Sequence, residues 1–171
     1  MKRLILSLAL VAGFAGPAAA QTVILARHGE KADASADPLL SEAGVARSEA
    51  LALAVARAGV THVFSTPLQR TRLTGGPAAA AAGVDVRPVS LEGGGAAHIA
   101  RMTETLKALG SDDVALVVGH SNTVPAIAEA LGVAGVSAIS DCEYDRLIVI
   151  DMDGGAVRAV TGRYGAPTAP C

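Results

Sequence analysis

Residues 21–31 read QTVILARHGEK, an apolar run followed at once by a basic, hydrogen-bonding cluster. The apolar part, Val23–Ala26, is typical of a short buried strand. Arg27 and His28 come directly after it, and burying a guanidinium and an imidazole costs free energy unless anionic or polar groups meet them. The stretch therefore predicts a buried strand that ends at an anion-binding site.

The sequence on either side of this stretch alternates between strands and helices. Short runs bounded by polar residues, glycine or proline predict five further strands, at His62–Ser65, Val84–Val89, Ala115–Gly119, Leu147–Asp151 and Val157–Thr161. Helical stretches lie in most of the gaps between them. This alternation predicts an α/β fold with a largely parallel central sheet.

Four helices are expected in these gaps. The first begins after the N-cap Ser41 and runs to about Ala58, where Gly59 ends it. Its apolar faces are expected to comprise Val45, Leu51, Leu53 and Val55. The second follows Pro67, breaks at residues 75–77 (Gly-Gly-Pro) and resumes over Ala78–Ala82. The third spans about Ala96–Leu109, and the fourth runs from Asn122 to Gly132.

The first twenty residues have the composition of an export signal. Lys2-Arg3 is a basic start, Leu4–Ala15 is apolar, and residues 18–20 (Ala-Ala-Ala) form a small-residue cleavage site. The apolar run of about twelve residues is shorter than the roughly twenty that a membrane-spanning helix needs. We therefore expect a signal peptide over residues 1–20, a periplasmic mature protein without membrane insertion, and a single domain over residues 21–171.

The composition of the mature chain argues against several classes of partner. Loss of the two basic signal residues moves the formal net charge from −2 to −4, whereas nucleic-acid-binding proteins usually present a basic face. Only Phe64, Tyr144 and Tyr164 carry aromatic rings, too few for stacking on single-stranded bases. Cys142 and Cys171 are the only cysteines, and in an exported chain they are candidates for a disulfide rather than a zinc site.

Three polar clusters follow predicted strands, at the ends where open α/β sheets place their ligand sites. They are residues 27–30 (RHGE), 65–71 (STPLQRT) and 117–123 (VVGHSNT). If these strands are parallel, the side chains that converge are Arg27, His28, Arg70 and His120. Arginine presents a planar fork of donors that matches phosphoryl oxygens, and an imidazole supplies a nucleophilic nitrogen or a hydrogen-bond donor. The clusters therefore predict a phosphate pocket.

These clusters resemble, in order and spacing, the motifs of the histidine phosphatase superfamily, the phosphoglycerate-mutase-like proteins. The resemblance spans nearly the whole mature chain and implies a three-layer sandwich with helices on both faces of the sheet. It implies that His28 becomes phosphorylated, that Arg27 and Arg70 clamp the phosphate, and that His120 binds the phosphoryl group. It also implies phosphohydrolase activity on phosphate monoesters or a phosphorylated protein, with no metal or organic cofactor.

Ser121 follows the second motif histidine, where the acid-phosphatase and phytase branch of the superfamily has an aspartate. The chain therefore resembles the compact mutase-like branch, and Ser121 is a further candidate for phosphate binding. Ser121 and Asn122 are also expected to cap the fourth helix, whose N-terminal amides can face the phosphate.

A proton donor is needed for the leaving oxygen. Glu92 lies about where mutase-like members carry a glutamate, but three glycines follow it, so a solvated loop glutamate is an equal alternative. Glu30, Asp33 and Asp37 are the other carboxylates near the motifs. Lys31 either contacts a substrate anion or is solvated.

Two features outside the motifs receive structural interpretations. His62 and His98 are expected at the surface or as core residues with satisfied hydrogen bonds. Residues 141–146 (DCEYDR) precede a predicted strand and are interpreted as a turn.

Three other functions stay open at this point. A phosphoglycerate mutase-type phosphotransferase would return the phosphoryl group to its substrate, although export argues against a glycolytic role. A protein that lost turnover would bind a phosphorylated ligand without cleaving it. A metallohydrolase would use His28, Glu30 and His120, although two arginines in the site would repel a metal ion. The sequence leaves both the physiological substrate, a small phosphorylated molecule or a phosphoprotein, and the oligomeric state open.

Overall fold

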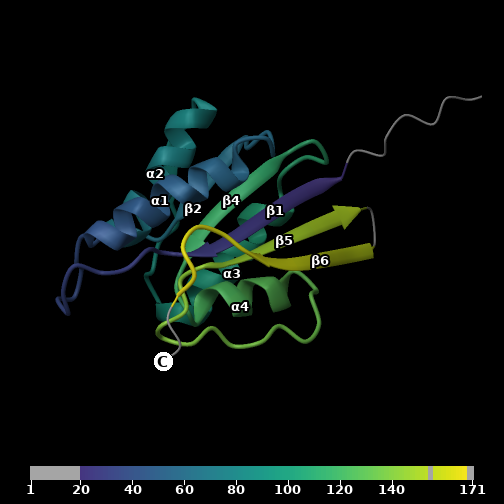
Figure 1. Cartoon of the computed structure of the whole chain (residues 1–171). Helices are drawn as coiled ribbons and strands as arrows, with labels where there is room; N and C mark the ends of the chain where they lie inside the picture. The colour runs from purple at the N-terminus through teal and green to yellow at the C-terminus, as the bar shows by residue number, and fades with distance from the viewer. Residues whose placement is uncertain (1–19, 154–155, 169–171) are drawn as a thin grey trace, which may run out of the picture.

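The computed structural model describes residues 20–153 and 156–168, and all ten expected elements are present in it (Figure 1). In chain order they are β1 (Gln21–Arg27), α1 (Glu42–Val55), β2 (His62–Ser65), α2 (Gln69–Ala82), β3 (Val86–Pro88), α3 (Gly94–Lys107), β4 (Val114–Gly119), α4 (Thr123–Ala130), β5 (Arg146–Asp153) and β6 (Ala156–Arg163). The expected signal peptide, apart from Ala20, and Cys171 lie outside the described residues, so the cleavage and the disulfide stay predictions.

The strands form one mixed sheet in the order β3-β2-β4-β1-β5-β6. Strands β1 to β4 are mutually parallel where they pair, and β5 and β6 continue the sheet as an antiparallel hairpin beside β1. The parallel part confirms the predicted α/β class. Because β2, β4 and β1 are adjacent and parallel, their carboxyl ends lie at one edge of the sheet, where the three sequence clusters begin.

Helices cover both faces of the sheet, which makes the fold a three-layer sandwich (Figure 1). Successive residues of a strand point to opposite faces, so Val23 and Leu25 of β1 pack with α3 and α4, whereas Ile24 and Ala26 pack with α1 and α2. Strand β4 alternates in the same way. This double burial explains why both strands are continuous apolar runs rather than alternating ones.

Helix α1 begins where the sequence predicts, because the Ser41 side chain accepts a hydrogen bond from the amide of Gly44. The prediction that Val45 and Leu53 belong to the apolar, packed face of this helix was wrong, because these side chains are 47% and 79% exposed. The buried stripe consists of Gly44, Arg47, Ser48, Leu51 and Val55. These positions recur every three or four residues and therefore share one face, to which Val45 and Leu53 do not belong.

Helix α2 runs through the Gly-Gly-Pro sequence without the expected break, so that prediction was wrong. Pro77 removes one amide donor, but the residues on either side are held by packing. A Cβ on Gly75 would lie 3.1 Å from Val63 Cγ1, so the helix approaches the sheet closely there. Ala78 and Ala79 are 2% and 3% exposed. Burial of the later turns against the sheet outweighs the local cost of the proline.

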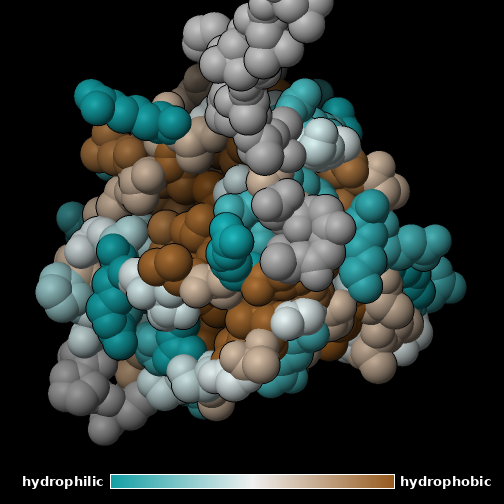
Figure 2. All heavy atoms as spheres, turned by 90° about the vertical axis from the view of Figure 1, so that its right-hand side faces the viewer, coloured by the Kyte–Doolittle hydropathy of each residue, from teal (hydrophilic) through white to brown (hydrophobic). Residues whose placement is uncertain are grey.

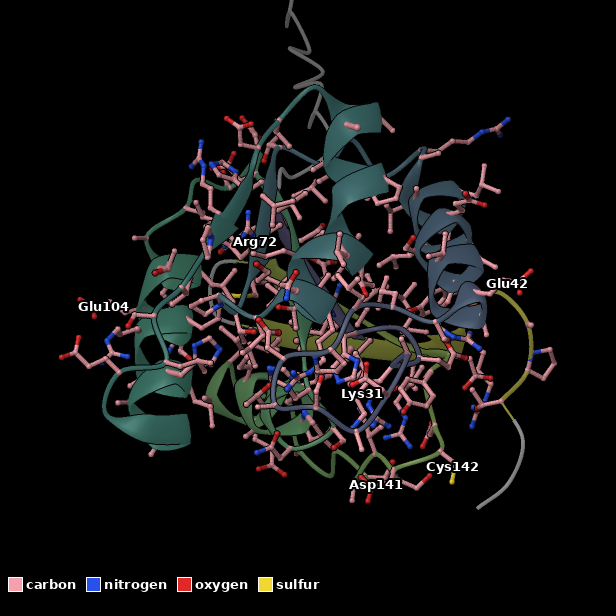
Figure 3. The ribbon with its side chains drawn as sticks, turned by 90° about the vertical axis from the view of Figure 1, so that its left-hand side faces the viewer. Lys31, Glu42, Arg72, Glu104, Asp141 and Cys142 are labelled. Atoms are coloured by element: carbon pink, nitrogen blue, oxygen red, sulfur yellow. The ribbon has the colours of Figure 1, made fainter. Side chains whose placement is uncertain are left out.

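The two ends of the sheet differ in character. Figure 2 shows the end at which β1 begins, where hydrophobic side chains gather in the middle of the face and polar ones surround them. Figure 3 shows the opposite end, where Lys31, Asp141 and Cys142 lie around the carboxyl ends of the parallel strands. Within the described part of the chain, no helix has the length and apolar character needed to span a membrane.

Candidate active site

Arg27, His28 and His120 meet where β1 and β4 end. Arg27 pairs with Gly119 in the sheet register, and the amide of His28 donates to the carbonyl of Gly119 at 3.0 Å. The rings of His28 and His120 are consequently neighbours, with centroids 5.3 Å apart in a T-shaped arrangement. The predicted convergence of the two motif histidines is confirmed by this geometry.

His28 is held by its own loop. Its Nδ1 lies 2.7 Å from the carbonyl oxygen of Gly29, and the side chain is almost fully buried. A carbonyl only accepts hydrogen bonds, so Nδ1 must carry the proton and Nε2 must carry the lone pair. The ring is therefore fixed in the tautomer in which Nε2 is nucleophilic.

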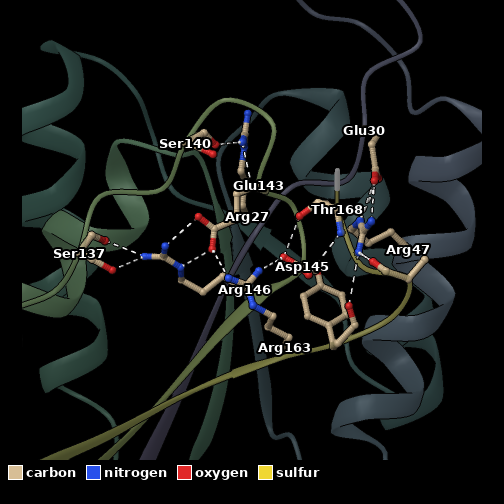
Figure 4. Close-up of polar contacts among 12 residues, drawn as sticks. Arg27, Glu30, Arg47, Ser137, Ser140, Glu143, Asp145, Arg146, Arg163 and Thr168 are labelled. Carbon is tan, nitrogen blue, oxygen red and sulfur yellow. Dashed lines mark hydrogen bonds and ion pairs between the residues drawn. The ribbon is translucent and has the colours of Figure 1, made fainter. Parts of the chain in front are cut away.

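The Arg27 side chain is held by a segment that is distant in sequence (Figure 4). Its Nη1 donates to the backbone carbonyls of Ser140, Asp141 and Glu143 at 2.8, 3.0 and 2.9 Å. The guanidinium carbon lies 4.1 Å from the ring centroid of Tyr144, a cation–π contact. Among the described residues its Nε is buried and has no hydrogen-bond partner. That nitrogen is the donor left for an anionic ligand.

Arg70 enters the site from the first turn of α2. Its Nη1 donates to the carbonyl of Ala36 at 3.2 Å and lies 3.8 Å from the carboxylate of Asp37. Within the described chain its Nε is also buried without a partner. The two arginines thus share one property: each is anchored through Nη1 and keeps a buried Nε donor uncommitted.

The site lowers the basicity of both histidines. The pKa of His28 is lowered to about 4, mainly by burial and also by the charges of Arg27, Arg70 and Lys31, while the hydrogen bond to Gly29 acts in the opposite direction. The pKa of His120 falls to about 3, again mainly through burial, with interactions with His28, Arg70, His98 and Arg27 lowering it as well. Both rings are therefore neutral at pH 7, which a nucleophilic imidazole requires.

The RHGE loop is fixed against helix α1. A Cβ on Gly29 would lie 2.8 Å from the carbonyl oxygen of Gly44, so only glycine permits this approach. Both carboxylate oxygens of Glu30 bind Arg47, the shortest contact being 2.6 Å, and Arg47 also donates to the carbonyls of Tyr164 and Ala166. Glu30 is therefore a structural anchor, and its expected availability as a proton donor or metal ligand is not supported.

The other candidate residues lie near this centre or at its rim. Ser121 is half-buried beside His120, and Lys31 is exposed but close enough for its charge to act on His28. Glu92 is exposed in the turn before α3, where its carbonyl accepts from Arg101 and its amide donates to Ser90. None of the contacts given for Glu92 joins it to the arginines and histidines, so its role as proton donor stays a prediction.

Asp33 and Asp37 were the remaining alternative carboxylates. Asp33 is exposed and accepts from the amide of Ser35, while Asp37 accepts from the amide of Gln69 and faces Arg70. Among the described residues, no three His, Cys, Asp or Glu side chains are grouped so as to hold a metal ion. With two guanidinium groups beside the histidines, the donor set suits an anion instead.

Three interpretations of neighbouring residues need correction. Asn122 is the N-cap of α4 but its side chain makes no capping bond; instead Thr123 Oγ1 accepts from the amide of His120 at 3.0 Å. Residues 141–142 form the expected turn, but the segment does more than turn the chain, because the carbonyls of Asp141 and Glu143 accept from Arg27 and the Tyr144 ring centroid lies 6.0 Å from that of His28. His98 is fully buried with Nδ1 3.2 Å from the carbonyl of Ser90, but its Nε2 has no partner within the described chain.

His62 fits its expected structural role. It is half-buried, with Nδ1 2.8 Å from Thr61 Oγ1 and 3.5 Å from the carboxylate of Asp113. The 140–144 segment and Tyr144 are the functional elements that sequence reasoning missed. Tyr144 is one of two tyrosines in a chain poor in aromatic residues, and that scarcity was the only available signal.

Residues 23–91 match the family described as histidine phosphatase superfamily (branch 1). The match covers 69 of the 171 residues and is to the superfamily that the sequence motifs resemble. The matched segment contains Arg27, His28 and Arg70 and ends before His120, which the fold brings to the same site. No curated protein matches the sequence.

Solved phosphatase structures share this fold. The proposed phosphohistidine phosphatase SixA from Nakamurella multipartitia is 25% identical, with a TM-score of 0.61 over 90% of this chain and 100% of its own. SixA from Agrobacterium tumefaciens is also 25% identical, with a TM-score of 0.59 over 85% and 97% of the two chains. A mycobacterial glucosyl-3-phosphoglycerate phosphatase bound to inorganic phosphate, at 16% identity and a TM-score of 0.62, covers 85% and 97% and shares the fold. This histidine phosphatase is thus a phosphohydrolase of the compact type.

Proposed function

We propose that this histidine phosphatase cleaves phosphate monoesters through a phosphohistidine on His28. Nε2 of His28 attacks phosphorus in line, the P–N bond forms, and the P–O bond to the leaving alcohol breaks as that oxygen takes up a proton. Water then attacks the phosphohistidine, which releases inorganic phosphate and restores the neutral ring. What carries the proposal is the hydrogen bond from Nδ1 to Gly29, because it leaves the Nε2 lone pair free.

The uncommitted arginine donors support the second part of the proposal, binding of the phosphoryl group. Arg27 and Arg70 each keep a buried Nε–H, and two such donors match the equatorial oxygens on which charge is spread during transfer. His120 lies beside the nucleophile and is the third group for these oxygens. Positioning and charge stabilisation are the main contributions of an enzyme to this chemistry.

The phosphatase neighbours support a class of substrate for this chain. The SixA proteins are named for a phosphohistidine substrate, and the mycobacterial enzyme for a phosphorylated sugar derivative. We place the substrate of this chain among small phosphate monoesters and phosphoproteins. A panel of both kinds, assayed for phosphate release by the purified mature protein, distinguishes them, and turnover of any member excludes a protein that only binds.

A rapid-quench experiment with labelled nitrophenyl phosphate tests the mechanism. Wild-type enzyme should yield an acid-labile, alkali-stable phosphoprotein, and His28→Ala should yield neither this species nor turnover. His120→Ala should lose about 10²–10³-fold in rate, as when one oxyanion donor is removed, yet retain slow labelling. The matched control His62→Ala should behave as wild type. Labelling that survives in His28→Ala and disappears in His120→Ala would reverse the two roles.

We further propose that residues 1–20 direct export and that the enzyme acts in the periplasm. The support is the basic, apolar and small-residue order of this segment. Cell fractionation with N-terminal sequencing should find a periplasmic chain that starts at or near Gln21. Full-length protein confined to the cytoplasm would refute the proposal.

A further inference from the structure

Residues 65–71 (STPLQRT) contain a pair of buried hydroxyl groups that have no assigned role in the phosphate site described above. Thr66 and Thr71 are both fully buried, and their Oγ1 atoms are 2.8 Å apart. Thr71 Oγ1 also lies 2.8 Å from the carbonyl oxygen of Leu68 and 3.0 Å from that of Thr66. Thr66 Oγ1 lies 3.2 Å from Nε2 of His120. A continuous chain of contacts therefore leads from helix α2 to the second catalytic histidine.

The direction of these hydrogen bonds follows from the carbonyl groups. A carbonyl oxygen accepts only, so the single hydroxyl proton of Thr71 must point to Leu68 or to the carbonyl of Thr66. Thr71 Oγ1 can then only accept from Thr66, which uses the single proton of Thr66. Thr66 Oγ1 is left as an acceptor, and the Nε2 of His120 must donate to it.

We propose that Thr66, held by Thr71, is a positioning residue that fixes His120 with its proton on Nε2. The proposal rests on the proposed role of His120 in binding the phosphoryl group. The neutral ring then carries its lone pair on Nδ1, the opposite of His28, whose proton is on Nδ1. Two histidines with ring centroids 5.3 Å apart are thus kept in different tautomers by different partners.

This arrangement has a consequence for how His120 binds the phosphoryl group. Since Nε2–H is committed to Thr66, the neutral ring has no second N–H to offer an anion. His120 must therefore take up a proton on Nδ1 to donate to a phosphoryl oxygen. Burial and the surrounding groups His28, Arg70, His98 and Arg27 oppose that proton, and the negative charge of a bound phosphoryl group favours it.

The tautomer of His120 can be measured directly in the resting enzyme. Two-bond ¹H–¹⁵N correlation spectra of ¹⁵N-histidine-labelled protein at pH 7.5 distinguish the two tautomers, and His120→Asn and His28→Asn assign the two signals. We expect the Nε2–H pattern for His120 and the Nδ1–H pattern for His28. An Nδ1–H pattern at His120 overturns the proposal. Because no turnover is measured, this result is independent of whether the phosphohistidine mechanism holds.

Variants of Thr66 and Thr71 test whether these hydroxyl groups set the tautomer of His120. Thr66→Val removes the hydroxyl with little change in shape, and we expect a mixed tautomer pattern at His120 and about a tenfold loss of kcat, at the lower end of the 10–100-fold seen for hydrogen-bond partners of metal-bound histidines. Thr66→Ser, which keeps a hydroxyl group, should have the wild-type tautomer pattern at His120 and the wild-type kcat. Thr71→Val should free the Thr66 proton to donate to Nε2 and shift His120 toward the Nδ1–H form.

The matched control is Thr105→Val, because within the described residues the Thr105 hydroxyl donates only to the Arg101 carbonyl of its own helix. It should leave the His120 pattern and kcat unchanged. An unaltered Nε2–H pattern in Thr66→Val would show that another group sets the tautomer. If Thr66→Val does not fold, the resting spectrum of the wild type still decides the orientation.

Discussion

Arg27 divides its guanidinium between two tasks. Its Nη1 is bound by three backbone carbonyls, its face packs on Tyr144, and its Nε keeps a buried donor free of partners in the described structure. Another positively charged side chain does not reproduce these contacts, because only the planar guanidinium can bind the carbonyls and offer a further N–H donor at the same time. The identity of the residue, and not only its charge, should therefore matter.

Arg27→Lys tests this division. We expect kcat/KM for nitrophenyl phosphate to fall about 100-fold or more, the range found when one transition-state donor is removed, although the charge is kept. The control is Arg158→Lys on the exposed strand β6, which should be neutral. An Arg27→Lys enzyme that retains a third of wild-type activity would show that charge alone suffices.

Glu92 offers a second test at a single residue. If Glu92 protonates the leaving oxygen, Glu92→Gln should slow hydrolysis of alkyl phosphates far more than that of nitrophenyl phosphate, whose leaving group barely needs a proton. The ratio of the two kcat/KM values is the measurement. Glu129→Gln, an exposed site on α4, is the control. Equal losses on both substrates would remove Glu92 from the mechanism.

The RHGE loop and helix α1 behave as one element joined by Glu30 and Arg47. The side chain of Arg47 is 4% exposed and that of Glu30 is 22% exposed, so the pair is largely shielded from water. Breaking a buried pair leaves an uncompensated charge, which costs far more than breaking a surface pair. The loop that carries His28 is thus anchored by an interaction that takes no part in the chemistry.

Glu30→Gln should therefore destabilise the fold by about 2–3 kcal/mol, below the range for fully buried pairs because Glu30 is partly solvated. Urea unfolding at pH 7.5 measures this as a lower midpoint. Glu49→Gln, on the exposed side of the same helix, should change the midpoint little. A midpoint for Glu30→Gln equal to that of the control would show that the pair does not anchor the loop.

The sequence predicted the elements well where a local pattern determines them. The ends of β1 and β4 carried Arg27, His28 and His120, and the adjacency of these two parallel strands was enough to bring the three residues together. It failed for Val45 and Leu53, because α1 buries a stripe that includes Arg47 and Ser48, which no hydrophobicity pattern selects. It also failed at Pro77, where packing of α2 on the sheet overrides the local preference.

The clamp on Arg27 lay beyond sequence reasoning for a different reason. Its carbonyl partners are 113 to 116 residues away in the chain, and backbone carbonyls carry no side-chain signature. The hydroxyl chain from Thr71 to His120 lies within recognised motifs, but the direction of its hydrogen bonds depends on distances between groups. Residue types could be predicted from sequence, whereas their mutual orientation could not.

The two neutral histidines make the stability of the whole molecule depend on pH. The folded pKa values of about 4 for His28 and about 3 for His120 lie below the value near 6.5 expected in the unfolded chain. Below pH 6.5 the unfolded state therefore binds protons that the folded state does not. Their contribution is fully present above pH 6.5 and is lost progressively as the pH falls toward 4 and then 3.

We accordingly expect the urea midpoint to fall between pH 7.5 and pH 5. The double variant His28→Gln/His120→Gln removes both groups and should show a shallower decline over the same interval. Circular dichroism at a series of pH values measures both curves. Identical slopes for wild type and double variant would mean that other groups govern the loss of stability in acid.

Strand β1 lies inside the sheet, between β4 and β5, although it comes first in the described chain. Its pairing partners begin at Val114 in β4 and at Leu147 in β5, so the strand that carries the nucleophile cannot be paired on both sides until almost the entire chain is available. Contacts this distant in sequence slow folding, because the intervening loop must close first. The catalytic centre is consequently among the last parts to assemble, and in refolding experiments phosphatase activity should return only with the final kinetic phase, after most helical signal has been regained.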